Sequence, residues 1–394
     1  MGRLAGGILL IVGTSIGGGM LALPMVSVSG GFWSSTFLLI GCWAVMTLAA
    51  LFILEVNLWL PPRNNLISMA KATLGVPGAV ATWVSYILLL YALLCAYISG
   101  GSELFDSFSK KLGLNVPAWC DSVLFVLLFG YIVYQGIRFV DYANRALMIA
   151  KFASLFAVIF FSFPYIEKSH VLIGDPRLVF GATTVMLTSF GFANIIPSLR
   201  SYFNDDVKSL RKAVLIGSCI PLICYILWNF AIIGALPREE LLAVTARGGS
   251  VAELTELLSM HLNNPSITVL ASLFTTICVL TAFLCVALAL SDFLADGLKI
   301  EKKGRKGNAF IYGLTFLPSL LIVIFFPSIF VKALSYAGIF CVILIILLPA
   351  LMVFSGRYVK KIAKGYQVIG GKISIVGIVI ISLVMIALGI KEIF

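Results

Sequence analysis

Residues 11–24 of this chain read IVGTSIGGGMLALP and lie within its first long apolar segment. A second stretch, residues 188–197, reads TSFGFANIIP and lies within another apolar segment farther along. Both stretches place hydroxyl-bearing residues and glycine in the middle of a segment that would otherwise form a continuous helix. Backbone groups that an interruption releases at membrane depth must bind a partner or line a cavity. The pair therefore predicts two interrupted helices that form a binding site together.

The composition places these stretches in a membrane. The chain has 394 residues, of which 61% are hydrophobic and 11% are charged. Apolar runs of about 20 residues are long enough to cross a bilayer as helices, and the alternating pattern of a membrane β-barrel is absent. We therefore expect an all-α polytopic membrane protein. The net charge of +11 comes from basic residues between the apolar segments, so we expect the lipid bilayer, and no nucleic acid, as a partner.

Few residues are suited to metal, cofactor or enzyme chemistry. The eight cysteines are scattered singly without CxxC spacing, and the two histidines lie in polar connections. A membrane enzyme would need histidines, cysteines or carboxylates clustered at one depth. We therefore expect no enzyme activity, no metal and no cofactor. A channel or a substrate sensor stays as an alternative, although no ring of charged residues indicates a pore.

Eleven apolar segments are candidates for membrane spans. Their expected bounds are residues 4–28, 32–60, 79–105, 117–137, 143–165, 179–199, 210–235, 267–298, 308–326, 330–355 and 373–391. If the N-terminus is cytoplasmic, 20 of the 28 lysines and arginines lie on the cytoplasmic side and 8 on the outer side. The positive-inside rule therefore predicts a cytoplasmic N-terminus and, with eleven spans, a periplasmic C-terminus. We also expect residues 236–265 to form a helical hairpin on the outer face.

The positions of the two stretches predict an internal repeat. They lie in the first and the sixth span, so spans one to five would match spans six to ten. An odd number of spans in each repeat gives the two halves opposite orientations. We expect a single transporter domain, residues 1–394, in which residues 4–165 and 179–355 form a 5+5 inverted repeat. Residues 373–391 then add one C-terminal helix.

The first stretch resembles the opening of the bacterial aromatic amino-acid permeases. These are the tyrosine- and tryptophan-specific transporters of the hydroxy/aromatic amino-acid permease family. Four further stretches fit in the same order: residues 54–58 (LEVNL), 97–101 (YISGG), 291–297 (SDFLADG) and 335–338 (SYAG). The resemblance covers essentially the whole chain. It implies a LeuT-like fold of the amino-acid/polyamine/organocation superfamily with eleven helices.

The resemblance also implies an activity. We expect a secondary active transporter in the bacterial inner membrane that imports aromatic L-amino acids, tyrosine first, by proton symport with alternating access. The residues leave open whether the substrate is tyrosine, tryptophan or phenylalanine. They also leave open whether sodium replaces the proton as the coupling ion. We expect the monomer to be functional.

The two interruptions are suited to the charged ends of an amino acid. The amide groups of the three glycines would open a second half-helix, whose positive dipole end attracts a carboxylate. The carbonyls that end the first half-helices suit an ammonium. The alternative is that the glycines only allow close helix packing. The predicted substrate-binding residues are Gly13, Thr14, Ser15, Gly17, Gly18, Gly19, Tyr97, Ser189, Phe190, Gly191, Asn194 and Tyr336.

The aromatic part of the substrate needs a wall of its own. We expect Phe190, beside the second interruption, to stack on an aromatic ring. Tyr97 and Tyr336 are expected to line the same wall. Asn194 would give a hydrogen-bond partner to a tyrosine hydroxyl or an indole N–H.

Three charged residues fall inside expected spans at a similar depth near the cytoplasmic side: Lys151, Asp292 and Glu55. Charges at such a depth are costly and are usually paired or functional. In LeuT-like sodium transporters, helices 1 and 8 hold an ion near helix 5. By that resemblance, Lys151 would be a built-in cation whose protonation ties helix 5 to helices 1 and 8. Asp292 would be its partner or a gate residue, and Glu55 would serve in coupling or gating.

Two of these charges also have a structural explanation. Lys151 can extend its stem and place its ammonium among lipid headgroups. Asp292 can pair with a cytoplasmic basic residue. Three carboxylates near the outer ends, Glu103, Asp106 and Asp121, are expected to be solvated.

Overall fold

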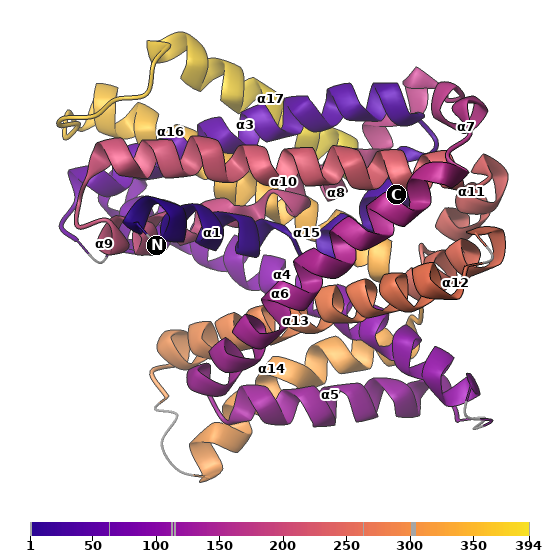
Figure 1. Ribbon diagram of the computed structural model, residues 1–394. Helices are drawn as coiled ribbons and strands as arrows, with labels where there is room; N and C mark the ends of the chain where they lie inside the picture. The colour runs from indigo at the N-terminus through magenta and orange to yellow at the C-terminus, as the bar shows by residue number, and fades with distance from the viewer. Residues whose placement is uncertain are drawn as a thin grey trace.

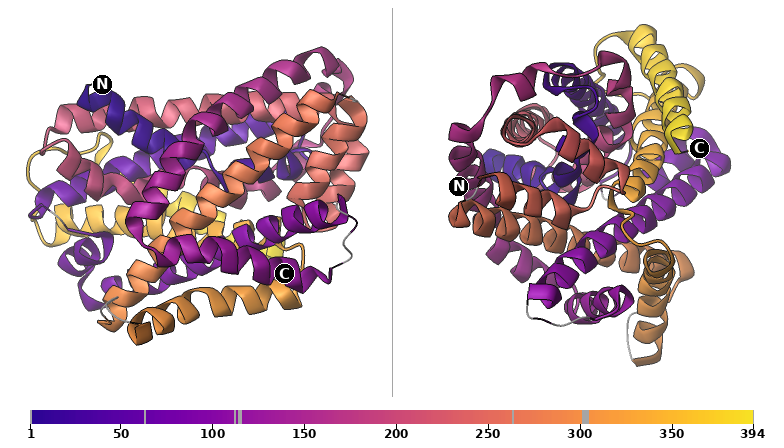
Figure 2. Two further views of the ribbon diagram at one scale, coloured as in Figure 1. Left: turned by 60° about the horizontal axis from the view of Figure 1, so that its bottom comes forward. Right: turned by 90° about the vertical axis from the view of Figure 1, so that its right-hand side faces the viewer.

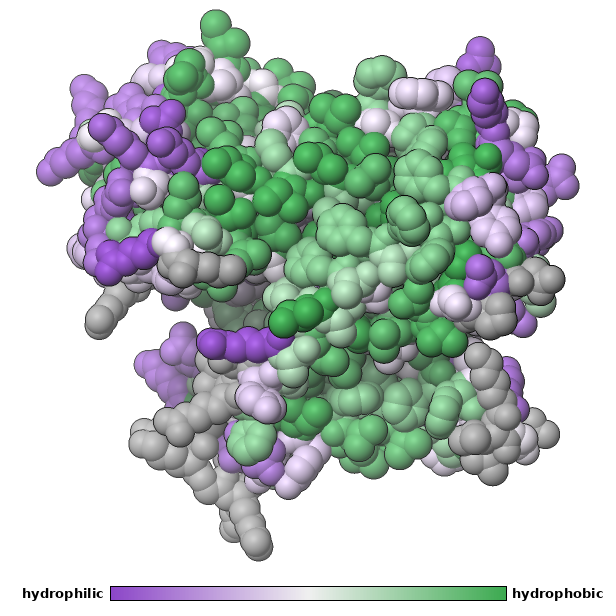
Figure 3. All heavy atoms as spheres, in the orientation of Figure 1, coloured by the Kyte–Doolittle hydropathy of each residue, from purple (hydrophilic) through white to green (hydrophobic). Residues whose placement is uncertain are grey.

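The computed structural model describes residues 2–62, 64–111, 113, 116–262, 264–300 and 305–393. Within these residues the chain forms helices and no strand, and most of the helices run roughly along one direction (Figure 1). Apolar side chains cover the middle of the surface, while hydrophilic residues gather at the two ends of that direction (Figure 3). This arrangement confirms an all-helical, multi-pass membrane protein.

Nine helical segments of the described chain are long and apolar enough to cross a membrane, or ten if the bent pair at the N-terminus is one span. Seven of them lie mainly in a single labelled helix, namely α3 (Phe32–Trp59), α4 (Leu66–Lys111), α6 (Ile137–Ser162), α10 (Val207–Ala235), α13 (Pro265–Leu298), α14 (Arg305–Phe325) and α17 (Gly371–Ile393). A shorter apolar helix, α5 (Ala118–Tyr134), stands where the fourth span is expected.

Both predicted interruptions are present. The first span consists of α1 (Arg3–Ser15) and α2 (Gly18–Ser27), which are bent by 55° at the break. The segment containing the second stretch runs through η2 (Pro176–Ala182), α8 (Thr183–Ser189), η3 (Gly191–Ile195) and α9 (Ile196–Tyr202). Here the α-helix ends at Ser189 and continues as a 3₁₀-helix, so the interruption is a change of helix type rather than an open gap.

The segment expected as the tenth span is one continuous helical rod of changing type. It runs through α15 (Phe330–Cys341), the π-helical η4 (Val342–Leu347), α16 (Leu348–Phe354) and the π-helical η5 (Ser355–Val359). The π turns loosen the hydrogen-bond ladder and bulge the helix locally.

Gly75 divides the helix that contains the third span into two parts, and the longer part starts close to the predicted residue 79. The helix α4 already starts at Leu66, and Gly75 interrupts it with φ 80° and ψ −162°. A positive φ is strained for residues with a side chain, so glycine is the natural residue at this bend.

A side-chain cap sets the start of α10: Asp206 accepts hydrogen bonds from the backbone N–H groups of Lys208 and Ser209, where this helix begins. The Ser209 hydroxyl and these amides lower the pKa of the Asp206 carboxyl.

The short helices mark the two ends of the molecule. Figure 1 places α9 at the left-hand end and α7 (Lys168–Leu172), α11 (Arg238–Ala246) and α12 (Val251–Leu262) at the right-hand end. We call these the α9 end and the α12 end. The pair α11 and α12 is the predicted helical hairpin. A view onto the α12 end shows α14 and α17 at the periphery of the bundle (Figure 2).

The interrupted helices lie in the interior. The helix α1 packs against α10, and α2 packs against α8, α10 and α13. Around them, α4 packs against α13 and α15, and α13 packs against α6. Every residue of α2 is buried. Four apolar side chains around the break are fully buried, namely Ile11, Ile16, Met20 and Leu21. The packing therefore encloses most of the first break, while Gly17 within it stays partly exposed.

Candidate substrate site at the two helix breaks

At the first break, two residues with extended backbone separate α1 from α2. Ile16 has φ −78° and ψ 99°, and Gly17 has φ −156° and ψ −151°. The helix resumes at Gly18, so the amides at its start point toward the break, where a helix leaves its first N–H groups without intrahelical partners. This is the geometry that the glycine run predicts for a carboxylate site.

The three glycines differ in what surrounds them. A side chain on Gly18 would collide with the ring of Tyr97, and one on Gly19 would come within 3.0 Å of the Ser189 hydroxyl oxygen. These two positions therefore serve close packing of the first span on α4 and α8. Gly17 has more room, since a methyl group there would first meet Ala282 at 3.8 Å. Gly18 and Gly19 thus serve packing, while Gly17 keeps open space beside it.

The second break lies directly against the first. Ser189 and Phe190 are both buried, and the Ser189 hydroxyl donates to the carbonyl oxygen of Val185 at 2.9 Å. The Phe190 ring lies 5.1 Å from the ring of Tyr225, between centroids. Beyond the break, the N–H of Phe192 donates to the carbonyl of Phe190 at 2.8 Å, which forms a tight turn.

Tyr225 of α10 joins the two breaks. Its hydroxyl lies 2.6 Å from the carbonyl oxygen of Ser15 and 2.7 Å from that of Ser189, and the whole side chain is buried. Tyr225 was not predicted as a site residue, because nothing in the sequence distinguishes it from the other tyrosines among the thirteen of the chain. A signal was present, however: a tyrosine inside an apolar span must find a partner for its hydroxyl.

Lys151 of α6 binds the break itself. Its ammonium donates to the carbonyl oxygen of Ile16 at 2.7 Å, and only 2% of the residue is exposed. The side chain therefore turns inward to the first span rather than outward to lipid headgroups. Within the described part of the chain Lys151 forms no ion pair. Its remaining polar neighbours are the thiols of Cys278 and Cys285 on α13.

Two other predicted charges lie elsewhere. The Asp292 side chain on α13 is exposed, and the structure does not bring it to Lys151. Glu55 on α3 is fully buried, and its two oxygens accept from Nε and Nη2 of Arg357, each at 2.6 Å. The N–H of Val368 donates to the same carboxylate at 2.7 Å. Glu55 thus fastens α3 to η5 and to the segment that follows it.

Four further predicted site residues flank the two breaks along the chain. Gly13 faces Met148, and the Thr14 hydroxyl donates to the carbonyl of Leu10 at 2.7 Å. Gly191 has no neighbour within 4 Å of the position that a Cβ would take. The Asn194 side chain is exposed.

Tyr336 lies at the surface. It is 44% exposed and lines a surface cavity of about 370 Å³ together with Val26, Thr245 and Ser335. The residues that do meet at the breaks are Ser15, Gly17, Gly18, Gly19, Tyr97, Ser189 and Phe190.

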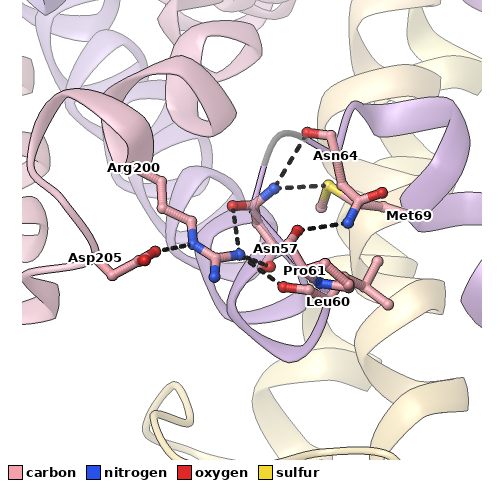
Figure 4. A network of polar contacts seen from close by, with 7 residues as sticks. All are labelled: Asn57, Leu60, Pro61, Asn64, Met69, Arg200 and Asp205. Atoms are coloured by element: carbon pink, nitrogen blue, oxygen red, sulfur yellow. Dashed lines mark hydrogen bonds and ion pairs between the residues drawn. The ribbon is translucent and has the colours of Figure 1, made fainter.

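A polar network connects helix ends at the α9 end of the molecule (Figure 4). The guanidinium of Arg200 on α9 pairs with Asp205 and donates to the carbonyl oxygens of Asn57 and Leu60 at the end of α3. Arg200 is only 7% exposed. The interrupted sixth segment is therefore attached to the end of the second span, a contact that no sequence motif indicated.

A second network fastens the α12 end. One oxygen of Glu103 on α4 accepts from the Ser250 hydroxyl at 2.8 Å and from the N–H of Val251 at 3.0 Å. The other accepts from the Ser99 hydroxyl at 3.2 Å. The expectation of a solvated carboxylate is wrong for Glu103, which caps α12, and for Asp121, which is 2% exposed. Both lie within helix contacts that a linear reading cannot reveal.

Among the described residues, no three His, Cys, Asp or Glu side chains gather as metal ligands would. The candidate site is formed instead by backbone groups at two interrupted helices in the interior of a multi-pass helical bundle. Such a construction defines a class, namely membrane carriers of small polar solutes.

The chain belongs to the tryptophan/tyrosine permease family, whose family model matches residues 1–389. It is similar to Tyrosine-specific transport system 1 of Haemophilus influenzae, with 32% identity over 388 residues, covering 98% of this chain and 96% of the relative. It is also similar to the Tryptophan-specific transport protein of the same organism, with 32% identity over 392 residues and 94% and 92% coverage.

A third relative carries a different name. Glutamine transporter 2 of Aliivibrio fischeri is 31% identical over 359 residues, which cover 90% of this chain and 89% of the relative. The family and these relatives are transport proteins. The chain is therefore a membrane transport protein and not an enzyme.

Proposed function

We propose that this protein is a secondary active transporter that imports aromatic L-amino acids, tyrosine first, by proton symport with alternating access. The observation that carries the proposal is the meeting of the two interrupted helices, whose backbone groups at the helix ends suit both charged ends of an amino acid. Family membership supports the substrate class, because relatives of similar identity are named for tyrosine and for tryptophan.

The substrate would be held mainly by backbone. Its carboxylate would face the amides at the start of α2, around Gly17 and Gly18. Its ammonium would face the carbonyls of Ser15 and Ser189, which end α1 and α8. The buried rings of Phe190 and Tyr97 offer an aromatic wall beside these groups. A zwitterion would thus be selected without a charged side chain in direct contact.

The proposed fold is LeuT-like, with eleven spans in which α5 is the fourth and α17 the eleventh. The two breaks, which repeat the pattern Thr-Ser-x-Gly, support an inverted repeat of residues 4–165 and 179–355. The excess of lysine and arginine supports a cytoplasmic position for the N-terminus and the α9 end. The hairpin of α11 and α12 would then cover the periplasmic side.

Proton coupling would act through Lys151. In its charged form the ammonium holds the Ile16 carbonyl, so α6 is tied to the break of the first span. Loss of the proton weakens this charge-assisted bond and would free α6 to separate from α1. Sodium coupling on the same fold is the alternative.

Uptake by purified protein in proteoliposomes tests the function. Vesicles receive a labelled aromatic amino acid under an imposed proton or sodium gradient, with unlabelled tyrosine, tryptophan, phenylalanine and glutamine as competitors. We expect accumulation of tyrosine that requires the proton gradient and collapses with a protonophore. Accumulation driven by sodium alone would contradict proton coupling. Equilibration without accumulation would favour a channel.

A further inference from the structure

Ser15 and Ser189 occupy the same place in the two repeated stretches, Thr14-Ser15-Ile16-Gly17 and Thr188-Ser189-Phe190-Gly191. Each serine is also the last residue of an α-helix, since α1 ends at Ser15 and α8 ends at Ser189. Carbonyls at a helix end lack an intrahelical donor. The repeat therefore presents two equivalent carbonyl oxygens that need donors, in a part of the bundle where bulk water is excluded.

One side chain serves both oxygens. The Tyr225 hydroxyl lies 2.6 Å from the Ser15 oxygen and 2.7 Å from the Ser189 oxygen. A phenol carries one hydrogen, so it can fully satisfy only one of two acceptors at a time. The site is thus short of one donor. The nearby ammonium of Lys151 does not relieve this shortage, because among the described residues it donates to the Ile16 carbonyl and not to these two oxygens.

An ammonium group carries three hydrogens and would satisfy both carbonyls at once. Under the proposed function, on which this inference rests, the ammonium of the amino acid is directed to these two oxygens. We propose that the Tyr225 hydroxyl is the carrier's own substitute for the substrate ammonium. It bonds the two carbonyls while the carrier is empty and releases at least one of them when an amino acid binds.

The inference assigns Tyr225 to one half of the transport cycle. Net uptake requires the empty carrier to return across the membrane, and in that state the two carbonyls depend on the tyrosine. Exchange of internal for external substrate requires no empty return, because substrate occupies the site in both directions. A buried carbonyl without a donor is costly. Loss of the hydroxyl should therefore slow net uptake and leave exchange largely intact.

The test compares Tyr225→Phe with wild type in proteoliposomes. We expect the rate of net uptake to fall about tenfold, as one lost hydrogen bond to a buried carbonyl implies, while substrate exchange stays within about twofold. The matched control is Tyr91→Phe, which removes a hydroxyl bonded at 2.8 Å to the Leu314 carbonyl. The ratio of net uptake to exchange should be unchanged in that control.

Equal loss of net uptake and exchange in Tyr225→Phe would overturn the inference, since it would mark a structural role. Unchanged net uptake would overturn it as well. Wild-type vesicles that take up none of the amino acids would contradict the proposed function instead, and with it the basis of the inference. These outcomes are distinguishable because the wild-type measurement precedes the comparison.

A second variant keeps the inference testable if Tyr225→Phe does not fold. Replacement of Tyr225 by 4-aminophenylalanine retains the ring and supplies two N–H donors, enough for both carbonyls. The side chain should then compete with the substrate more strongly, and KM should rise several-fold while the exchange rate at saturation is retained. An unchanged KM would overturn the inference.

Discussion

Lys151 shows at the scale of one residue how a charge can be kept inside this bundle. Its ammonium is almost fully buried and is held by a backbone carbonyl that the first break makes available. Its depth was predictable from its position in an apolar segment, because that argument needs only helical rise. Its partner was not, since Ile16 is 135 residues away and contributes only a carbonyl oxygen.

Lys151→Met should remove proton coupling while keeping the volume of the side chain. We expect accumulation under an imposed proton gradient to fall to the level reached without a gradient, because no protonation change then controls the contact with Ile16. Uptake into proteoliposomes measures this. Lys212→Met, at an exposed position on α10, is the control and should accumulate substrate like wild type. Undiminished accumulation in Lys151→Met would refute the coupling role.

At the scale of elements, the ends of the helices are joined by a few buried polar contacts. Glu55 and Arg357 connect α3 with η5, Arg200 connects α9 with α3, and Glu103 connects α4 with α12. The helices themselves were predictable from hydrophobic segments, mostly to within a few residues. These connections were not, because each depends on which helix ends become neighbours in space.

The pair of Glu55 and Arg357 should behave as a buried ion pair. Their side chains are 0% and 6% exposed. Arg357→Met leaves the Glu55 charge buried without its partner and should cost about 3 to 5 kcal/mol of stability. The double variant Glu55→Gln/Arg357→Met should lose clearly less, because no lone charge is left. Thermal unfolding in detergent measures both.

An exposed pair provides the control for this prediction. Lys110 is 67% exposed in its ion pair with Asp106, so Asp106→Asn should change stability by less than about 1 kcal/mol. A double variant as unstable as Arg357→Met alone would show that the charge pairing is not what stabilises this end.

Glu103 should hold α12 in place. In Glu103→Gln an amide nitrogen, which cannot accept a hydrogen bond, replaces one acceptor oxygen, and the remaining carbonyl oxygen is uncharged. The bonds from Ser250 and Val251 are therefore weakened. We expect the amide of Val251 to exchange with deuterium about tenfold faster, because one bond of about 1.4 kcal/mol is lost. Hydrogen–deuterium exchange with mass spectrometry measures this. Glu253→Gln, on the exposed side of α12, should leave that rate unchanged; unaltered protection in Glu103→Gln would contradict the role of Glu103.

At the scale of the whole molecule, the two breaks lie in the interior, and the longer helices pack around them. Composition and segment lengths predict a multi-pass helical membrane protein, and the structure confirms it. The two stretches also predicted where the helices are interrupted, because glycine weakens a helix in the middle of an otherwise continuous apolar span. Tyr336 and Asn194 show the limit of that reasoning. Their spacing along the chain is compatible with a shared site, but both side chains are exposed, whereas Ser189 and Phe190 are buried.

The central claim is that backbone at the two breaks binds both charged ends of an amino acid. Equilibrium binding to the purified protein tests it directly, with tyrosine, tyramine and 3-(4-hydroxyphenyl)propanoate as ligands. These three share the phenol ring, while tyramine lacks the carboxylate and the propanoate lacks the ammonium. Removal of either end should weaken binding about 100-fold, since hydrogen bonds to a charged group are lost in each case. Binding of either analogue as tight as that of tyrosine would contradict the account.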